Sequence, residues 1–224
     1  MRFFATILAL IAITPSVQAG AWPRDVGTTF LSFGSTIQLQ NSQNSAGMDP
    51  TYSLYVEHGL KRELTLGFDF SGKSHVDYQA IAFVRAPVFK GSEQNKFAVQ
   101  LGAGVTASAG ANELILQGGF SWGRGMMTGI GAGWASVDTQ VIYFANGGNT
   151  AAKADLTLGL KPAQKLKLMM QFQTGAYPGS DPYVRIAPSA TWELKPGRHI
   201  ELGAQIGVIN DDNLGAKIGT WLEF

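Results

Sequence analysis

Residues 199–208 read HIELGAQIGV, and this stretch decides the fold class. Its apolar side chains occupy every second position, namely Ile200, Leu202, Ala204, Ile206 and Val208. The positions between them carry polar side chains or glycine. Successive side chains of a helix point about 100° apart, whereas those of a β-strand alternate between two opposite faces. The stretch therefore predicts a β-strand with one apolar face and one polar face.

The same two-residue period recurs along the chain, most clearly in residues 150–160 and 165–173. It predicts an all-β fold, an antiparallel up-and-down barrel of about 12 strands, with about 10 as the alternative. Strands are expected near 26–39, 51–60, 63–71, 76–88, 95–107, 112–122, 125–137, 150–160, 164–174, 182–194, 199–208 and 213–224.

Compact turns alternate with longer connections between these predicted strands. The turns are Lys61-Arg62, Lys90-Gly91-Ser92, Gly123-Arg124-Gly125, Lys161-Pro162 and Lys195-Pro196-Gly197. The other connections are on average longer and richer in Asn, Asp, Ser and Gly. Barrels of the outer membrane have short periplasmic turns and longer outer loops. An even strand number then places both termini at the periplasmic end.

The first nineteen residues have the pattern of an export signal. Arg2 is followed by an apolar run that ends before Pro15, and the small residues Val17 and Ala19 flank Gln18. This pattern predicts a signal peptide over residues 1–19, cleaved after Ala19, and a single barrel domain over residues 20–224. The apolar run is too short to span a membrane as a helix, which needs about 20 residues.

Alternation alone would also fit a soluble barrel with its apolar face inward. A lumen of about 12 strands is, however, too wide for side chains to fill, since about eight strands give the closely packed case. No charged residue falls in the apolar register of a predicted strand. Aromatic residues of that register lie near strand ends, as in the girdles of membrane barrels. Those expected at the periplasmic boundary are Phe97, Trp122, Trp192 and Phe224, and those expected at the outer one are Tyr52, Phe70, Tyr78, Trp134 and Phe172.

The last strand ends on an aromatic carboxylate. One face carries Leu214, Ala216, Ile218, Thr220, Leu222 and Phe224. This ending resembles the terminal signature of bacterial outer-membrane β-barrel proteins. The resemblance implies a Gram-negative outer-membrane location, lipid around the barrel, and the barrel-assembly machinery as a partner that recognises Phe224.

A second resemblance covers residues 55–67, which read YVEHGLKRELTLG. This strand–turn–strand segment is similar to the "glycine-leucine, basic turn, leucine-glycine" hairpin of transporter-like outer-membrane proteins grouped with aromatic-degradation pathways. It implies a role in transport.

The inward register contains carboxylates and basic groups in nearly equal number, so strong selection of anions or cations is not implied. Many of these charges lie near the predicted periplasmic half, where charges on neighbouring strands can pair. They predict either a narrow polar constriction or an ion-paired plug. The residues assigned to it are Arg85, Lys96, Lys165, Lys167, Glu193, Glu201 and Glu223.

Groups for catalysis and metal binding are sparse. The chain has no cysteine and three histidines, none of them at metal-ligand spacing. Residues 71–77 read SGKSHVD and contain serine, histidine and carboxylate, the types used in hydrolysis, at His75 and its neighbours. A triad is assembled in space, so their closeness in sequence argues little. No cofactor, metal or catalytic activity is expected. The balance of 17 basic and 16 acidic residues, without a basic cluster, gives no support for a nucleic-acid partner.

Three functions remain open from the sequence. The leading one is a narrow passive channel or transporter for a small solute. The second is an occluded structural or adhesive barrel that acts through its outer loops. The third is an outer-membrane hydrolase.

Overall fold

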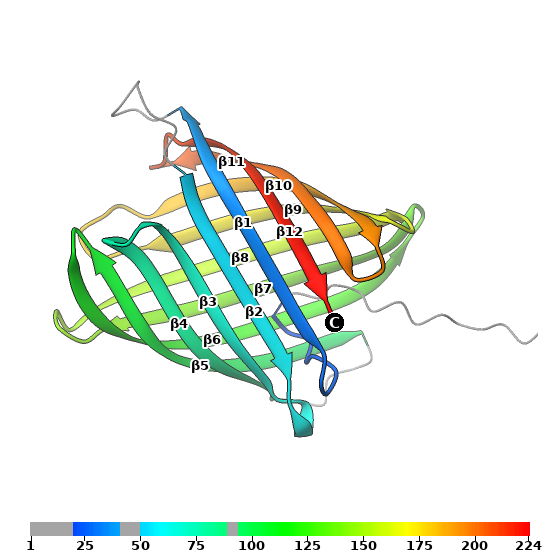
Figure 1. The fold of residues 1–224 in the computed structure, drawn as a ribbon, viewed down its shortest axis with the longest axis horizontal. Coiled ribbons are helices and arrows are strands. Elements are labelled where there is room, and N and C mark those ends of the chain that lie inside the picture. The colour runs from blue at the N-terminus through cyan, green and yellow to red at the C-terminus, as the bar shows by residue number, and fades with distance from the viewer. Residues whose placement is uncertain (1–19, 41–49, 89–93) are drawn as a thin grey trace, which may run out of the picture.

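The alternating segments pair side by side into one closed, twelve-stranded antiparallel barrel (Figure 1). A computed structural model describes residues 20–40, 50–88 and 94–224. The predicted signal peptide with its cleavage after Ala19 and the predicted turn Lys90-Gly91-Ser92 lie outside these residues. The strands are β1 (Thr29–Gln40), β2 (Pro50–Gly59), β3 (Thr65–Ser74), β4 (Asp77–Pro87), β5 (Asn95–Ser108), β6 (Ala111–Thr128), β7 (Gly131–Phe144), β8 (Asn149–Ala163), β9 (Leu166–Ala176), β10 (Tyr183–Lys195), β11 (Arg198–Ile209) and β12 (Leu214–Glu223).

Each strand pairs with its neighbours in sequence, and β12 closes the sheet against β1. The closing ladder runs from Phe30 opposite Glu223 to Gln40 opposite Leu214. We call the end that carries Thr29 and the C-terminus the terminal end, and the opposite end the loop end. Closure gives every strand two partners, so no sheet edge is left unpaired. The prediction of a twelve-stranded up-and-down barrel is confirmed.

The outer wall is apolar, as the alternation predicted. Side chains that face outward from the middle of the strands are exposed and largely aliphatic or aromatic, among them Leu101, Leu116, Phe120, Leu158, Leu168, Phe172, Leu202 and Ile218. The buried polar residues face the lumen instead, among them Glu57, Arg85, Gln100, Gln117, Thr157 and Glu201. This inside-out arrangement is that of a barrel whose surroundings are lipid. No helix in the described ranges is long and apolar enough to cross a membrane.

The boundary between β6 and β7 differs from the prediction. The expected turn at Gly123-Arg124-Gly125 lies inside β6, and the chain turns at residues 129–130. Gly123 is a packing glycine here, because a Cβ on it would lie 2.3 Å from the Trp22 ring. β7 consequently continues to Phe144, through residues 138–144 that were expected to form a loop.

The predicted position of Trp134 in the outer aromatic girdle is wrong. Trp134 is buried, lines the lumen and packs with Ala21 and Trp22. Its ring lies over Gly159, where a Cβ would come within 2.1 Å of it. The glycine on the neighbouring strand leaves room for an inward indole, which residue type alone does not reveal.

The C-terminal residue takes part in closing the barrel. The Phe224 N–H donates to the carbonyl of Thr29 at 3.0 Å, and the Thr29 N–H donates to the Phe224 carbonyl at 2.6 Å. The Phe224 side chain is exposed beside this closing pair. The terminal residue therefore has both a backbone role in the seam and a free aromatic ring.

We expect deletion of Phe224 to lower the amount of protein in the outer membrane, while export and signal removal continue. Substitution by alanine keeps the backbone pair and removes only the ring, so it separates recognition of the ring from closure of the seam. Quantitative blotting of outer-membrane fractions measures the effect. Wild-type abundance of both variants would show that the terminal aromatic is not needed for assembly.

Candidate functional site

The lumen at the loop end is a wide polar cavity. Its volume is about 1140 Å³. Hydroxyl, amide and charged side chains from β1–β3 and β8–β12 line it, together with Tyr177 and Asp181 of the connection that follows β9. A small solute that enters at this end therefore meets hydrogen-bonding groups on most sides.

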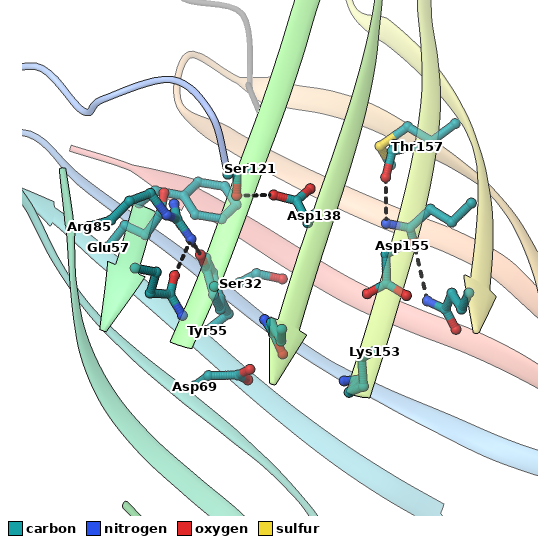
Figure 2. Close-up of a pocket in the computed structure, with 18 of the residues that line it drawn as sticks. Ser32, Tyr55, Glu57, Asp69, Arg85, Ser121, Asp138, Lys153, Asp155 and Thr157 are labelled. Carbon is teal, nitrogen blue, oxygen red and sulfur yellow. Dashed lines mark hydrogen bonds and ion pairs between the residues drawn. The ribbon is translucent and has the colours of Figure 1, made fainter. Parts of the chain in front are cut away.

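A second cavity, of about 400 Å³, lies deeper towards the terminal end (Figure 2). It is lined by Tyr55, Glu57 and Arg85 on one side and by Asp138 and Thr157 on another. The two cavities meet, because six side chains border both of them: Asp69, Lys153, Asp155, Gln171, Gln173 and Lys217. The lumen thus contains a polar path from the loop end to beyond the middle of the barrel.

Neutral amides form a hydrogen-bonded belt across β5, β6 and β7. Gln100 donates to Gln117 at 2.7 Å, and Gln117 donates to Gln140 at 3.1 Å. On the adjoining wall, formed by β8, β9 and β11, a second belt runs from Gln205 through Gln173 and Gln171 to the hydroxyl of Thr157. Such amides offer donors and acceptors without net charge.

The most buried charge in this region is the carboxylate of Glu57, in a residue that is 1% exposed. Arg24 Nε donates to Oε2 at 2.6 Å, and an Arg85 N–H donates to Oε1. The Tyr55 hydroxyl also donates to Oε1, at 2.6 Å, and accepts from Arg85 at 3.0 Å. A buried carboxylate is stable only when paired and hydrogen-bonded, and Glu57 has both kinds of partner. The group ties the wall strands β2 and β4 to Arg24, which precedes β1.

Arg24 belongs to what we call the inner segment, residues 20–24, which enters the terminal half of the lumen. Ala21 and Trp22 are buried, and Gly20 and Arg24 border the deeper cavity. Trp22 packs with Trp134, and the side chain of Met169 lies against this pair. The backbone N–H of Arg24 also donates to the Thr65 hydroxyl. The inner segment therefore narrows the polar path at its terminal end.

A second charged group lies on the β11–β12 wall. Lys217 Nζ donates to Glu201 Oε1 at 2.9 Å, and the Trp221 indole N–H donates to Oε2 at 3.1 Å. The Lys167 ammonium lies 5.8 Å from the centre of the Trp221 ring. The Phe30 ring packs edge-on against the Trp221 ring, with the two ring centres 5.9 Å apart.

The residues predicted for a constriction fall into separate places. Arg85 and Glu201 border the deeper cavity, and Lys167 is buried beside Trp221. The others lie towards the terminal end: Lys165 exposed in the turn after β8, and Lys96, Glu193 and Glu223 half-buried near strand ends. The expected pairing of opposite charges on neighbouring strands occurs between Lys217 and Glu201, whereas Arg85 pairs with Glu57 across the intervening strand β3.

Sequence reasoning missed the inner segment and Asp138. The segment has no two-residue period and precedes the first predicted strand, so alternation does not place it in the lumen. Asp138 falls in a predicted loop, because the sequence predicts the preceding turn at residues 123–125 and the chain turns at residues 129–130. A useful signal was available in Trp22 and Arg24, a large aromatic and a charge placed between a predicted cleavage site and the first strand.

The candidate hydrolytic residues lie in β3, in β4 and in the turn between them. Ser71 borders the loop-end cavity, whereas His75 is exposed in the two-residue turn between β3 and β4. Within the described part of the chain, no group of three or more His, Asp or Glu side chains could hold a metal ion.

At the loop end, Asp211 is held by the Arg185 guanidinium, the Asn213 N–H and the Asn213 side-chain amide. Burial alone would raise the pKa of Asp211, but these donors hold it below its ordinary value. A carboxyl whose pKa is lower in the folded state stabilises that state above its unfolded pKa of about 3.9, and this contribution is lost as the pH falls through the folded value.

We therefore expect the connection between β11 and β12 to loosen in acid. The protection factor of the Asn213 amide against hydrogen exchange should fall once the pH drops below about 4. In the Asp211→Asn variant the protection should be low at every pH, whereas Asp212→Asn, which changes an exposed neighbour, should behave as the wild type. A pH-independent protection factor in the wild type would contradict this prediction.

A closed barrel with an apolar outer wall and a polar lumen defines a transmembrane β-barrel of the outer-membrane type. No protein-family model matches the sequence, and no curated protein matches it. Among solved structures, the chain is similar to the KdgM porin, with a TM-score of 0.62 at 6% identity over 87% of this chain and 99% of the porin. It is also similar to the NanC porin, with a TM-score of 0.58 at 12% identity over 86% and 98% of the two chains. An outer membrane channel from Pseudomonas putida F1 gives a TM-score of 0.57 at 9% identity over 93% and 100%. The chain thus has the fold of bacterial outer-membrane channels.

Proposed function

We propose that the protein is a narrow passive channel of the bacterial outer membrane for small polar solutes. The observation that carries this proposal is the polar path through the lumen, in which two cavities meet along a shared wall. The similarity in fold to porins and outer-membrane channels agrees with the proposal.

The lining supports an uncharged or zwitterionic solute more than a strongly charged one. Amide belts lie on two adjoining parts of the wall, and ion pairs join Arg24 and Arg85 to Glu57, Lys217 to Glu201, and Arg185 to Asp211. The charged lining consists of carboxylates at Glu57, Asp69, Asp138, Asp155, Asp181, Glu201, Asp211 and Asp212, and of basic groups at Arg24, Lys73, Arg85, Lys153, Arg185 and Lys217. The small acidic excess supports at most a weak preference for cations.

Single-channel recording of refolded protein in a planar bilayer tests the proposal. We expect small conductance steps and a reversal potential in a salt gradient that indicates weak cation preference. Swelling of proteoliposomes in neutral sugars and amino acids of increasing size then measures the size limit. A correctly folded barrel that carries no current and admits no solute would overturn the channel proposal.

The alternative is an occluded barrel that acts through its loops. It is favoured by one observation, the inner segment in the terminal half of the lumen. The same recordings decide between the two, because an occluded barrel is silent. Hydrolysis is not proposed, since Ser71 lines the loop-end cavity and His75 does not.

A further inference from the structure

The backbone of Gly20 lies against the carboxylate of Asp138. A Cβ built on Gly20 would be 1.7 Å from Asp138 Oδ1 and 2.8 Å from the Ser121 hydroxyl. The Cα–Cβ bond is about 1.5 Å long and the N–Cα bond about 1.46 Å, so Oδ1 lies within about 5 Å of the Gly20 nitrogen. Position 20 also has a φ of +39°, which glycine adopts without strain. Glycine is thus the residue that this contact requires.

Asp138 is a lumen carboxylate that forms no ion pair with a described side chain; the Arg85 guanidinium acts on it electrostatically but is already paired with Glu57. Its hydrogen-bond partners are hydroxyls: Ser121 donates to Oδ1 at 2.6 Å, and Ser136 lies 3.4 Å from Oδ2. In the register of β7 with β8, Asp138 stands directly opposite Asp155, a second carboxylate. Like charges in that position repel, and a partly buried carboxylate is stabilised by a positive partner.

We propose that removal of the signal peptide supplies this partner: the α-ammonium group of mature Gly20 forms an ion pair with Asp138 inside the lumen. Hydrolysis of the Ala19–Gly20 peptide bond adds the hydroxyl of water to the Ala19 carbonyl carbon and a proton to the Gly20 nitrogen. The amine takes up a second proton at neutral pH, and the new Ala19 carboxyl releases one. A neutral amide with one donor becomes a cation with three donors beside a carboxylate and a serine hydroxyl.

This ion pair makes the processed N-terminus an anchor of the inner segment. Arg24 holds one end of the segment through Glu57, and the Gly20 ammonium holds the other through Asp138. The buried Ala21 and Trp22 lie between these two charged contacts. The lumen therefore reaches its final shape only in the cleaved protein. The inference depends on cleavage after Ala19 and holds whether or not the barrel conducts.

The pKa of the terminal amine tests the proposal. The full-length gene product is exported, purified from outer membranes, and checked by intact mass for a chain that begins at Gly20. Its amines are reductively methylated with ¹³C-formaldehyde, and the terminal dimethylamine is titrated by NMR in detergent micelles. We expect a pKa at least about one unit above the ordinary α-amino value of 7.7–8.0. Asp138→Asn should return it to the ordinary range, and the matched control Asp155→Asn should keep most of the increase.

Each result bears directly on the proposal. A chain that does not begin at Gly20, an ordinary pKa in the wild type, or an equal increase in Asp138→Asn would overturn it. The wild-type measurement decides even where Asp138→Asn fails to fold. Gly20→Ala adds an independent test, because its Cβ would collide with Asp138 and should lower the terminal pKa towards the ordinary range while cleavage continues.

Discussion

Replacement of Glu57 by glutamine is expected to lower the free energy of unfolding by about 3–5 kcal/mol, the range observed when one partner of a buried ion pair is removed. The neutral amide would leave Arg24 and Arg85 without their shared counter-charge. Their side chains are only 15% and 8% exposed, so water can replace little of the lost interaction. Two guanidinium groups held by one carboxylate would also repel each other once it is neutral.

Urea titration of the protein refolded in lipid vesicles, followed by tryptophan fluorescence, measures this change. The matched control is Glu201→Gln, in which the single ion-pair partner is Lys217. The Lys217 side chain is 31% exposed and can reach solvent, so the loss should be clearly smaller. Equal losses for the two variants, or a loss below about 1 kcal/mol for Glu57→Gln, would contradict a central structural role for the Glu57 group.

The fold could be predicted from the sequence because its main signal, the two-residue alternation, lies within each strand. The two-residue period of residues 199–208 and its repeats define which face of each strand is apolar. A soluble barrel of about 12 strands could not fill its lumen with side chains, so the apolar face must point outward, as in a closed membrane barrel. Glycines were harder to interpret. The sequence places Gly123 in a turn and assigns no role to Gly159, whereas each makes room for an indole that comes from elsewhere in the chain.

The candidate site could be predicted only in part, because alternation describes the strands and not the segments between or before them. Alternation shows that Arg85, Lys167 and Glu201 face inward, but it says nothing of what else enters the lumen. Arg24 and Trp22 reach it from a segment without period. The partner of Arg85 is Glu57, two strands away around the barrel. Gly67 of the intervening strand stands opposite Glu57 and leaves space for the Phe83 ring.

Removal of the Trp22 indole is expected to increase the single-channel conductance, by about twofold or more if the inner segment contains the narrowest section of the path. Trp22 is buried between Gly123 and Trp134 at the terminal end, below the deeper cavity. Trp22→Ala leaves the charged contacts of Arg24 in place and vacates the volume of one ring system. Loss of a buried tryptophan costs about 3–5 kcal/mol, so folding is checked first by the slower migration of the boiled sample in electrophoresis.

A second variant, Gly123→Ala in β6, should clear the same part of the lumen by a change in the barrel wall. A Cβ at position 123 would lie 2.3 Å from the Trp22 ring, so Gly123→Ala must displace the indole without altering it. Both variants should raise conductance, whereas Trp192→Ala, which removes an indole that is 50% exposed on the outside, should not. If the wild type is silent and both inner variants conduct, the inner segment is a plug that closes a potential channel. If all of them are silent although folded, the lumen is blocked independently of Trp22, and the barrel acts through its loops. A wild type that conducts, with no change in either inner variant, would place the narrowest section away from the inner segment, at the Glu57 group or the Glu201 group.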